Sequence, residues 1–219
     1  MANVISPIPE ERSNAVTEGA QPRPTGMNLP NQLTVARFFL TVLFVVAMSS
    51  NLPFAHSAGL LLFVLAGVTD YLDGEIARRR NLETDFGKLM DPLADKIMMA
   101  AAFICLIPLG AFPPWVAIVI ISREFLITGL RLLAASKGTV LPAEKLGKHK
   151  TVWQIVTVIY FLVLLAAAEF VSREAPALAN AWALLWKLGS IALVAVTLVL
   201  TIYSGLGYLW KNRGLISTA

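Results

Sequence analysis

Residues 182–210, WALLWKLGSIALVAVTLVLTIYSGLGYLW, decide the fold class of this chain. The only charged residue in this run is Lys187, and the run exceeds the roughly 20 apolar residues that a helix needs to cross the hydrocarbon core of a bilayer. It therefore predicts a transmembrane helix, because in lipid the backbone must satisfy its own hydrogen bonds. We expect Lys187 to extend toward the membrane interface or to pack internally.

Five further apolar stretches precede this one, so the sequence predicts an all-α, polytopic membrane protein with six transmembrane helices. Of the 219 residues, 57% are hydrophobic and 15% are charged, and the mean hydropathy is +0.69, which is unlike a soluble domain. We expect a disordered tail over residues 1–27, a membrane domain over 28–213 and a short tail over 214–219. The expected spans lie near residues 33–50, 55–77, 89–109, 114–133, 151–170 and 182–210.

Basic residues gather in alternate connections between these spans, which predicts the orientation of the chain through the positive-inside rule. The connections on the opposite side clearly carry only one basic residue, Arg173. We therefore expect both termini and both basic connections to lie in the cytoplasm, with the protein in a bacterial-type inner (plasma) membrane. The residues of the two basic connections are Arg78, Arg79, Arg80 and Lys88, and then Arg131, Lys137, Lys145, Lys148 and Lys150.

The charge distribution argues against a nucleic-acid-binding protein, and the cysteine content excludes an intrachain disulfide. The net charge of +4 is small and the basic residues stand between apolar blocks, which is typical of membrane-flanking segments rather than of a nucleic-acid surface. The single cysteine, Cys105, cannot form an intrachain disulfide, and we expect it to pack as a small hydrophobic residue.

In the last span, Gly189, Ser190, Gly205 and Gly207 are small enough to allow close helix approach or a dimer contact.

Four carboxylates stand out in the block DYLDGEIARRRNLETDFGKLMDPLAD, residues 70–95. Asp70 and Asp73 are three residues apart, and Asp91 and Asp95 are four apart, so each pair shares one helical face. An antiparallel hairpin of these helices would bring the two pairs together near their cytoplasmic ends. A carboxylate at the bilayer centre costs roughly 2.5–3.5 kcal/mol, so four together need a compensating positive charge.

A divalent cation is the compensation that we expect. Oxygen ligands without nearby Cys or His favour Mg²⁺, Mn²⁺ or Ca²⁺ over zinc, and Mg²⁺ commonly bridges carboxylates to phosphates. Gly74 and Gly87 leave space beside the backbone for a bulky ligand, and Arg78 offers a guanidinium fork for a diphosphate. The alternative is that the acids only pair with basic neighbours at solvated helix ends, which explains the paired spacing less well.

This block resembles the signature of the CDP-alcohol phosphatidyltransferase family, D-x2-D-G-x2-A-R-x8-G-x3-D-x3-D, at every specified position. Residues 28–37, 122–125, 129–135 and 147–151 resemble the members that use glycerol 3-phosphate as the acceptor. The resemblance implies a membrane enzyme of six helices, usually homodimeric, that holds two divalent ions, Mg²⁺ or Mn²⁺, in a polar cavity facing the cytoplasm.

The resemblance also implies a role for each matching residue. Asp70, Asp73, Asp91 and Asp95 would ligate the metal, and Asp95 would also act as the general base. The site for CDP-diacylglycerol would contain Asp70, Gly74, Ala77, Arg78, Thr84 and Gly87, with Asn31 and Thr34 approaching from the first helix.

The reaction that we expect transfers the phosphatidyl group of CDP-diacylglycerol to glycerol 3-phosphate, giving phosphatidylglycerol phosphate and CMP. The phosphate of the acceptor needs a second cationic site, for which the candidates are Arg123, Arg131, Lys145, Lys148 and Lys150. Arg123 lies deep in an apolar helix and requires an internal partner, and Glu124 is positioned in sequence to orient one of these cations. The three lysines fit membrane anchoring equally well.

Three alternatives remain at this point. The same donor chemistry serves other acceptors, such as inositol phosphate, serine or phosphatidylglycerol. A membrane prenyltransferase also uses paired aspartates and Mg²⁺, but its chains are typically longer and lack the D-x2-D-G-x2-A-R continuation. A divalent-cation transporter would also place acids in the membrane, and it predicts repeated halves that this sequence does not display.

Overall fold

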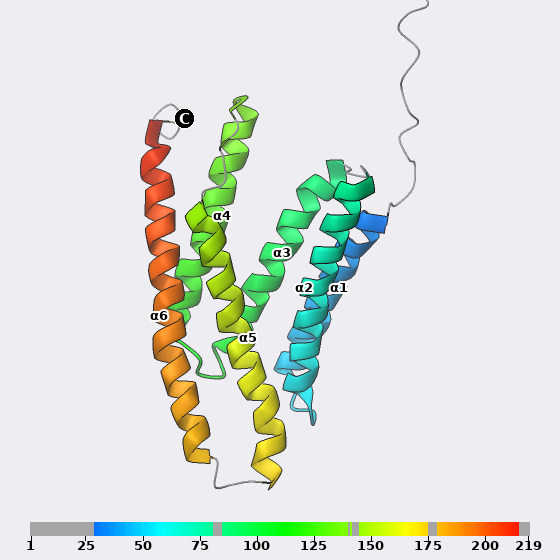
Figure 1. Cartoon of the computed structure of the whole chain (residues 1–219), viewed down its shortest axis with the longest axis vertical. Coiled ribbons are helices and arrows are strands. Elements are labelled where there is room, and N and C mark those ends of the chain that lie inside the picture. The colour runs from blue at the N-terminus through cyan, green and yellow to red at the C-terminus, as the bar shows by residue number, and fades with distance from the viewer. Residues whose placement is uncertain (1–28, 81–84, 140, 142–144, 175–178, 215–219) are drawn as a thin grey trace, which may run out of the picture.

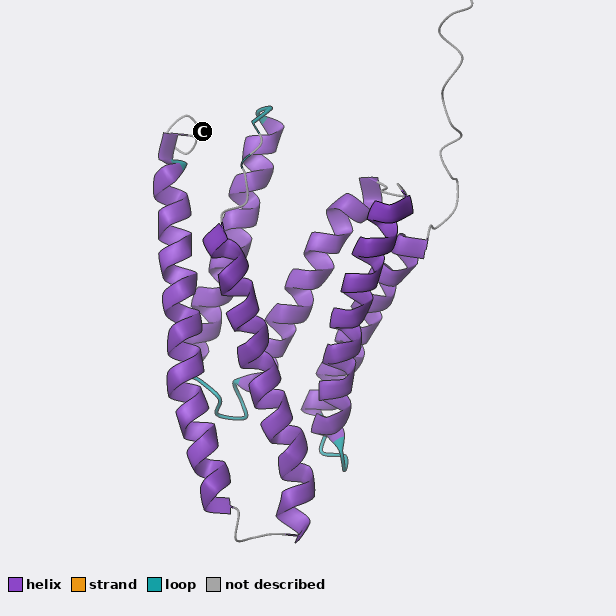
Figure 2. Ribbon diagram, viewed as in Figure 1, coloured by secondary structure: helices purple, strands orange, loops and turns teal. Residues whose placement is uncertain are grey.

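The computed structural model describes residues 29–80, 85–139, 141, 145–174 and 179–214, and in these residues it contains six α-helices and no strand (Figure 2). Each expected apolar stretch falls on one helix, so the all-α prediction is confirmed. The helices are α1 (Leu29–Ser49), α2 (Ala55–Arg80), α3 (Asp85–Leu106), α4 (Pro114–Ser136), α5 (Lys145–Glu174) and α6 (Ala179–Lys211).

The helices form two groups that run roughly along one direction. Helix α1 packs against α2 and α3, while α6 packs against α4 and α5, and α2 also contacts α5. Figure 1 shows α1, α2 and α3 on one side and α4, α5 and α6 on the other. The C-terminal ends of α2, α4 and α6 and the N-terminal ends of α1, α3 and α5 point toward the same end of the bundle. The described parts of the motif, residues 70–80 and 85–95, therefore lie toward that end.

Aromatic side chains fill the interior between the two groups. Phe44 of α1, Phe103 of α3 and Phe161 of α5 are almost completely buried in one apolar cluster. The Phe161 ring packs edge-on against Trp186 of α6, with 4.9 Å between the ring centroids. Cys105 packs against the same cluster, as predicted. Large apolar side chains on the outer surfaces of the helices remain exposed, which is expected where lipid replaces water.

Three stretches among the described residues are long and apolar enough to cross a membrane, and they identify a membrane protein. These stretches are Gln32–Ser49, His149–Phe170 and Asn180–Lys211. The apolar part of α2, Ala55–Tyr71, is shorter, because the acidic motif begins at its end. Helices α3 and α4 carry charged residues near their middles. Six spans therefore stay a prediction, while six helices are observed. Lys187 is exposed on α6, consistent with an interfacial side chain.

A carboxylate from α5 holds the start of α2. The backbone N–H groups of His56 and Ser57 donate to the Glu169 carboxylate at 2.7 and 3.0 Å, and Ser57 Oγ donates to it at 2.6 Å. His56 Nδ1 lies 3.0 Å from the same carboxylate. These bonds satisfy N–H groups that have no partner within the helix, and the negative charge is favourable at a helix N-terminus. They also fix α2 against α5, at the end of the bundle away from the acidic motif.

Candidate active site

An ion pair between α1 and α2 holds the first aspartate of the motif. Asp70 Oδ1 lies 2.6 Å from Arg37 Nη1. The arginine side chain is 1% exposed and the aspartate side chain is 46% exposed. One turn after Arg37, Thr41 Oγ1 donates to the Arg37 carbonyl at 2.8 Å. Because the guanidinium is buried among helices, it fixes the orientation of a carboxylate that still reaches solvent.

No role for Arg37 follows from the sequence pattern alone. Arg37 lies within one of the segments that carry the family resemblance, but only the packing of α1 on α2 shows its partner. The signal that could have found it is a single cation inside an apolar helix, which requires an internal counter-charge. Thr34, predicted to approach the donor from the same helix, is fully buried one turn before Arg37.

Asp70 and Asp95, the first and last acids of the motif, line the same cavity of about 360 Å³. We call it the aspartate cavity. Arg37 also lines it, and the rest of the lining is apolar or glycine apart from Tyr71; Phe63, Met98 and Ile155 are examples. The two acids come from α2 and α3, so the structure brings together one member of each predicted carboxylate pair. An apolar cavity with acids on its wall suits a ligand that is part lipid and part cation-bound anion.

Several predicted residues lie outside the part of the chain that the structure describes. Thr84 is one of them, and for seven residues inside helices the side chains are not described: Asn31, Asp73, Gly74, Ala77, Arg78, Gly87 and Asp91. Among the described side chains, no group of three His, Cys, Asp or Glu is placed to hold a metal ion. The four-carboxylate metal site and the diphosphate site therefore stay predictions. The described part fits them, because Asp70 and Asp95 offer hard oxygen ligands on one cavity wall.

A second cavity of about 250 Å³ lies among α3, α4, α5 and α6, and we call it the basic cavity. Its polar lining includes four basic side chains and one carboxylate, so its charge is strongly positive. The basic residues are Lys96, Arg123, Arg131 and Lys150, and the carboxylate is that of Glu124. Three of the five residues predicted to bind the acceptor phosphate therefore line one cavity. The side chains of the other two, Lys145 and Lys148, lie outside the described residues.

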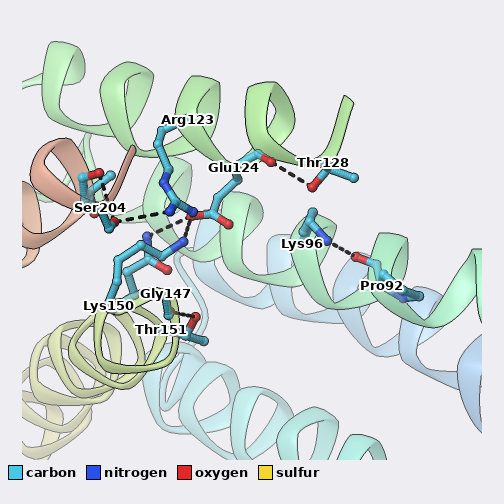
Figure 3. A network of polar contacts seen from close by, with 11 residues as sticks. Pro92, Lys96, Arg123, Glu124, Thr128, Gly147, Lys150, Thr151 and Ser204 are labelled. Atoms are coloured by element: carbon cyan, nitrogen blue, oxygen red, sulfur yellow. Dashed lines mark hydrogen bonds and ion pairs between the residues drawn. The ribbon is translucent and has the colours of Figure 1, made fainter. Parts of the chain in front are cut away.

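Glu124 organises the cations of the basic cavity (Figure 3). Its Oε1 pairs with Lys150 Nζ and lies 3.5 Å from Arg123 Nη1 and 3.5 Å from Gln154 Nε2. The Lys150 side chain is only 2% exposed, so this counter-charge is needed to keep the ammonium group in place. The expectation that Arg123 requires an internal partner, and that Glu124 orients a cation, agrees with these contacts.

Helix α6 also supports Arg123. Ser204 Oγ accepts a hydrogen bond from Arg123 Nη2 at 3.2 Å. At Gly205, a Cβ atom would lie 2.9 Å from Arg123 Cγ, so the glycine gives the arginine stem room to pass along α6. Sequence reasoning missed Ser204, since a serine in an apolar helix usually bonds its own backbone.

Lys96 and its neighbour in sequence, Asp95, line different cavities. Lys96 follows Asp95 directly on α3, yet Asp95 lines the aspartate cavity and Lys96 lines the basic cavity. Lys96 Nζ donates to the Pro92 carbonyl at 2.9 Å, which leaves its other two hydrogens for a ligand. The sequence pattern gave no sign that Lys96 lines a second cavity. The arrangement places a carboxylate of one cavity and an ammonium group of the other on neighbouring positions of one helix.

Comparisons with known proteins agree with the motif. Residues 27–203 match the family model described as CDP-alcohol phosphatidyltransferase. The chain is 41% identical over 204 residues to the CDP-diacylglycerol–glycerol-3-phosphate 3-phosphatidyltransferase of Bacillus subtilis, covering 88% of this chain and 98% of that protein. It is 41% identical over 128 residues to the protein of that name in Rickettsia bellii, covering 58% of this chain and 71% of the relative. A probable phosphatidylglycerophosphate synthase of Mycobacterium tuberculosis is 32% identical over 184 residues, covering 83% of this chain and 79% of the relative. With a family model that spans most of its length and the full aspartate signature, the chain belongs to the CDP-alcohol phosphatidyltransferase family.

Proposed function

We propose that this protein transfers the phosphatidyl group of CDP-diacylglycerol to glycerol 3-phosphate, which is the activity named in its relatives from Bacillus and Rickettsia. The observation that carries the proposal is the presence of two different cavities on α3, one lined by acids and apolar side chains and the other by four cations. The first suits a lipid-linked diphosphate and the second suits a phosphorylated alcohol. The products are phosphatidylglycerol phosphate and CMP.

The lining of the aspartate cavity supports a lipid donor. Apolar side chains from α2, α3 and α5 surround the space beside Asp70 and Asp95. The first part of an acyl chain or the glycerol backbone of CDP-diacylglycerol can occupy this space while the diphosphate stays near the acids. Residues assigned to the diphosphate and nucleotide in this proposal are Asn31, Thr34, Asp70, Gly74, Ala77, Arg78, Thr84 and Gly87.

The aspartates Asp70, Asp73, Asp91 and Asp95 would hold the divalent ions, two Mg²⁺ or Mn²⁺ in this proposal. When bound, such ions neutralise the diphosphate and stabilise the negative charge that develops on the phosphoryl oxygens and on the departing CMP. Arg37 holds Asp70 in one orientation, so this ligand oxygen is preorganised before the donor binds. Family membership supports dependence on a divalent metal.

Asp95 removes the proton from the acceptor hydroxyl in this mechanism. The hydroxyl oxygen forms a bond to the lipid-side phosphorus, the bond from that phosphorus to the CMP oxygen breaks, and CMP leaves. The cations of the basic cavity hold the acceptor's own phosphate, which keeps its hydroxyl near Asp95 and raises its effective concentration there. The neighbouring positions of Asp95 and Lys96 on α3 support this assignment, because they link the base to the acceptor cavity.

The basic cavity favours a phosphorylated acceptor over serine or another neutral alcohol. An acceptor without a phosphate would leave most of the four cations, which have only one carboxylate among them, without an anionic partner. The full arrangement that we propose is a homodimer with six spans per chain, in a bacterial-type inner membrane with both termini and the active site in the cytoplasm. Proteolysis or thiol labelling of sealed vesicles checks the orientation.

Purified protein in detergent micelles tests the reaction through the release of CMP from CDP-diacylglycerol. We expect release that requires both a divalent metal and glycerol 3-phosphate, and Asp95→Asn should abolish turnover while CDP-diacylglycerol still binds. An acceptor panel with serine, inositol phosphate and phosphatidylglycerol runs in parallel. Turnover with one of these and none with glycerol 3-phosphate would overturn the acceptor, and no metal-dependent CMP release with any alcohol would overturn the reaction.

A further inference from the structure

The hydroxyl group of Tyr208 on α6 has no role in the contacts described so far. Tyr208 lines the basic cavity, and the residue is 4% exposed. Its hydroxyl oxygen is buried and makes no hydrogen bond within the part of the chain that the structure describes. A buried hydroxyl without a partner destabilises a protein, so its presence here calls for a ligand that completes it.

Packing fixes the position of the Tyr208 ring. Ile127, Leu130 and Ala134 of α4 and Leu141 of the following segment surround it in a small buried cluster. The ring is therefore held along α4, and the hydroxyl cannot turn away to reach bulk water. Ser204 lies one turn earlier on α6 and lines the same cavity, where it holds Arg123. On this face of α6, the Ser204 hydroxyl is hydrogen-bonded to Arg123, whereas the Tyr208 hydroxyl has no hydrogen bond among the described residues.

The charge of the cavity indicates what the unoccupied hydroxyl binds. Four basic side chains line the space, so the ligand is an anion. A phenol O–H is a good donor to a phosphate oxygen, and a hydrogen bond to a charged acceptor is stronger than one between neutral groups. We infer that Tyr208 donates a hydrogen bond to the phosphate of the acceptor, as a neutral member of the acceptor site. The inference rests on the proposed function, in which this cavity receives glycerol 3-phosphate.

The inference predicts opposite effects of Tyr208→Phe on stability and on binding. In the protein without ligand the substitution removes an unsatisfied buried hydroxyl, so the thermal midpoint stays unchanged or rises. With ligand it removes a hydrogen bond to a charged group, so the KM for glycerol 3-phosphate rises at least about tenfold. The KM for CDP-diacylglycerol stays unchanged, because that donor occupies the other cavity.

Thr201→Val is the matched control. The Thr201 hydroxyl is also buried on α6 without a partner among the described residues, but it does not line the basic cavity. The substitution removes another buried hydroxyl that lacks a partner among the described residues and keeps the side-chain shape. We expect no change in the KM for glycerol 3-phosphate.

A binding measurement separates this inference from the proposed function. The rise in thermal midpoint on adding glycerol 3-phosphate, inorganic phosphate or glycerol is recorded for the wild-type protein and for both variants, without donor. We expect both phosphates to stabilise the wild type, Tyr208→Phe to lose most of this effect, and Thr201→Val to keep it.

Each contrary outcome has a distinct meaning. If phosphate stabilises the wild type but nothing is transferred to glycerol 3-phosphate, the proposed function is contradicted, and loss of this stabilisation in Tyr208→Phe alone still supports the Tyr208 contact. An active wild type with an unchanged KM in Tyr208→Phe overturns the contact. A lower midpoint of unliganded Tyr208→Phe means that the hydroxyl is structural, and this also overturns it. Loss of stabilisation by glycerol 3-phosphate but not by inorganic phosphate places the contact on the glycerol part, contrary to the inference.

Discussion

Gly205→Ala should weaken acceptor binding while leaving the fold intact. The new Cβ would lie 2.9 Å from Arg123 Cγ and 3.4 Å from Arg123 Nε. Real Cβ atoms do not approach other heavy atoms to the first of these distances, so the middle of the arginine stem must move. Its guanidinium then leaves Ser204 Oγ, which it contacts at 3.2 Å, and changes its place in the basic cavity.

The magnitude follows from the contact that is lost. A hydrogen bond that involves a charged group contributes about 1.5–3 kcal/mol, so the KM for glycerol 3-phosphate should rise roughly 10-fold to 100-fold. The folding energy changes much less, because the gain of about 0.5–1 kcal/mol from replacing a helical glycine offsets part of the steric penalty. Activity and stability should therefore separate.

CMP release measured against both substrates is the assay, with thermal unfolding of the same samples in detergent. Gly207→Ala is the control, since nothing lies within 4 Å of a Cβ built at Gly207 and the site is two residues away on the same helix. We expect it to keep the wild-type KM for both substrates. An unchanged KM for glycerol 3-phosphate in Gly205→Ala, or an equal rise in Gly207→Ala, would contradict the proposed role of Arg123 in acceptor binding.

Three other variants test the remaining parts of the site. Arg37→Met frees Asp70, so we expect the metal concentration for half-maximal CMP release to rise several-fold; unchanged metal dependence would argue against preorganisation of that ligand. Glu124→Gln leaves the ammonium of Lys150 without its carboxylate and should cost about 1–3 kcal/mol in unfolding free energy; adding Lys150→Met should recover stability but not activity. Glu169→Gln weakens the cap on the first turn of α2 and should cost about 1 kcal/mol with both KM values unchanged, whereas altered KM values would show that the two ends of the bundle are coupled.

The positions of the helices could be predicted because they depend on local properties. Each apolar stretch is close to the length of a bilayer span, and the interruptions contain proline, glycine or charge, so all six helices coincide with predicted stretches. The pairing of Asp70 with Asp95 on one cavity also follows from helical spacing and a hairpin. These inferences need no knowledge of how distant helices pack.

The residues that sequence reasoning missed depend on such packing. Arg37 forms its ion pair with Asp70 only because α1 packs on α2. Lys96 lines the basic cavity only because α4, α5 and α6 supply the rest of its lining. Gly205 was one of four small residues in α6 with the same expected use, yet the structure gives them different neighbours: Gly205 meets Arg123, Gly189 meets Tyr160, and Gly207 meets nothing. Small residues in a sequence show that another group can approach the helix closely, but only the structure shows which side chain does so.

In the proposed function, the path of α3 explains how a small membrane protein can keep acidic and basic ligand sites apart. Four cations close to four carboxylates would neutralise one another if they shared one space, and neither set could then bind its ligand. Neighbouring residues on a helix point about 100° apart, so Asp95 and Lys96 can face different cavities while their backbones stay joined. Glu124 pairs with the almost completely buried Lys150, so the aspartates are not needed as its counter-charge. In the proposed reaction the donor and acceptor sites therefore lie in different cavities along α3, and the acceptor hydroxyl must reach from the basic cavity to Asp95 in the aspartate cavity.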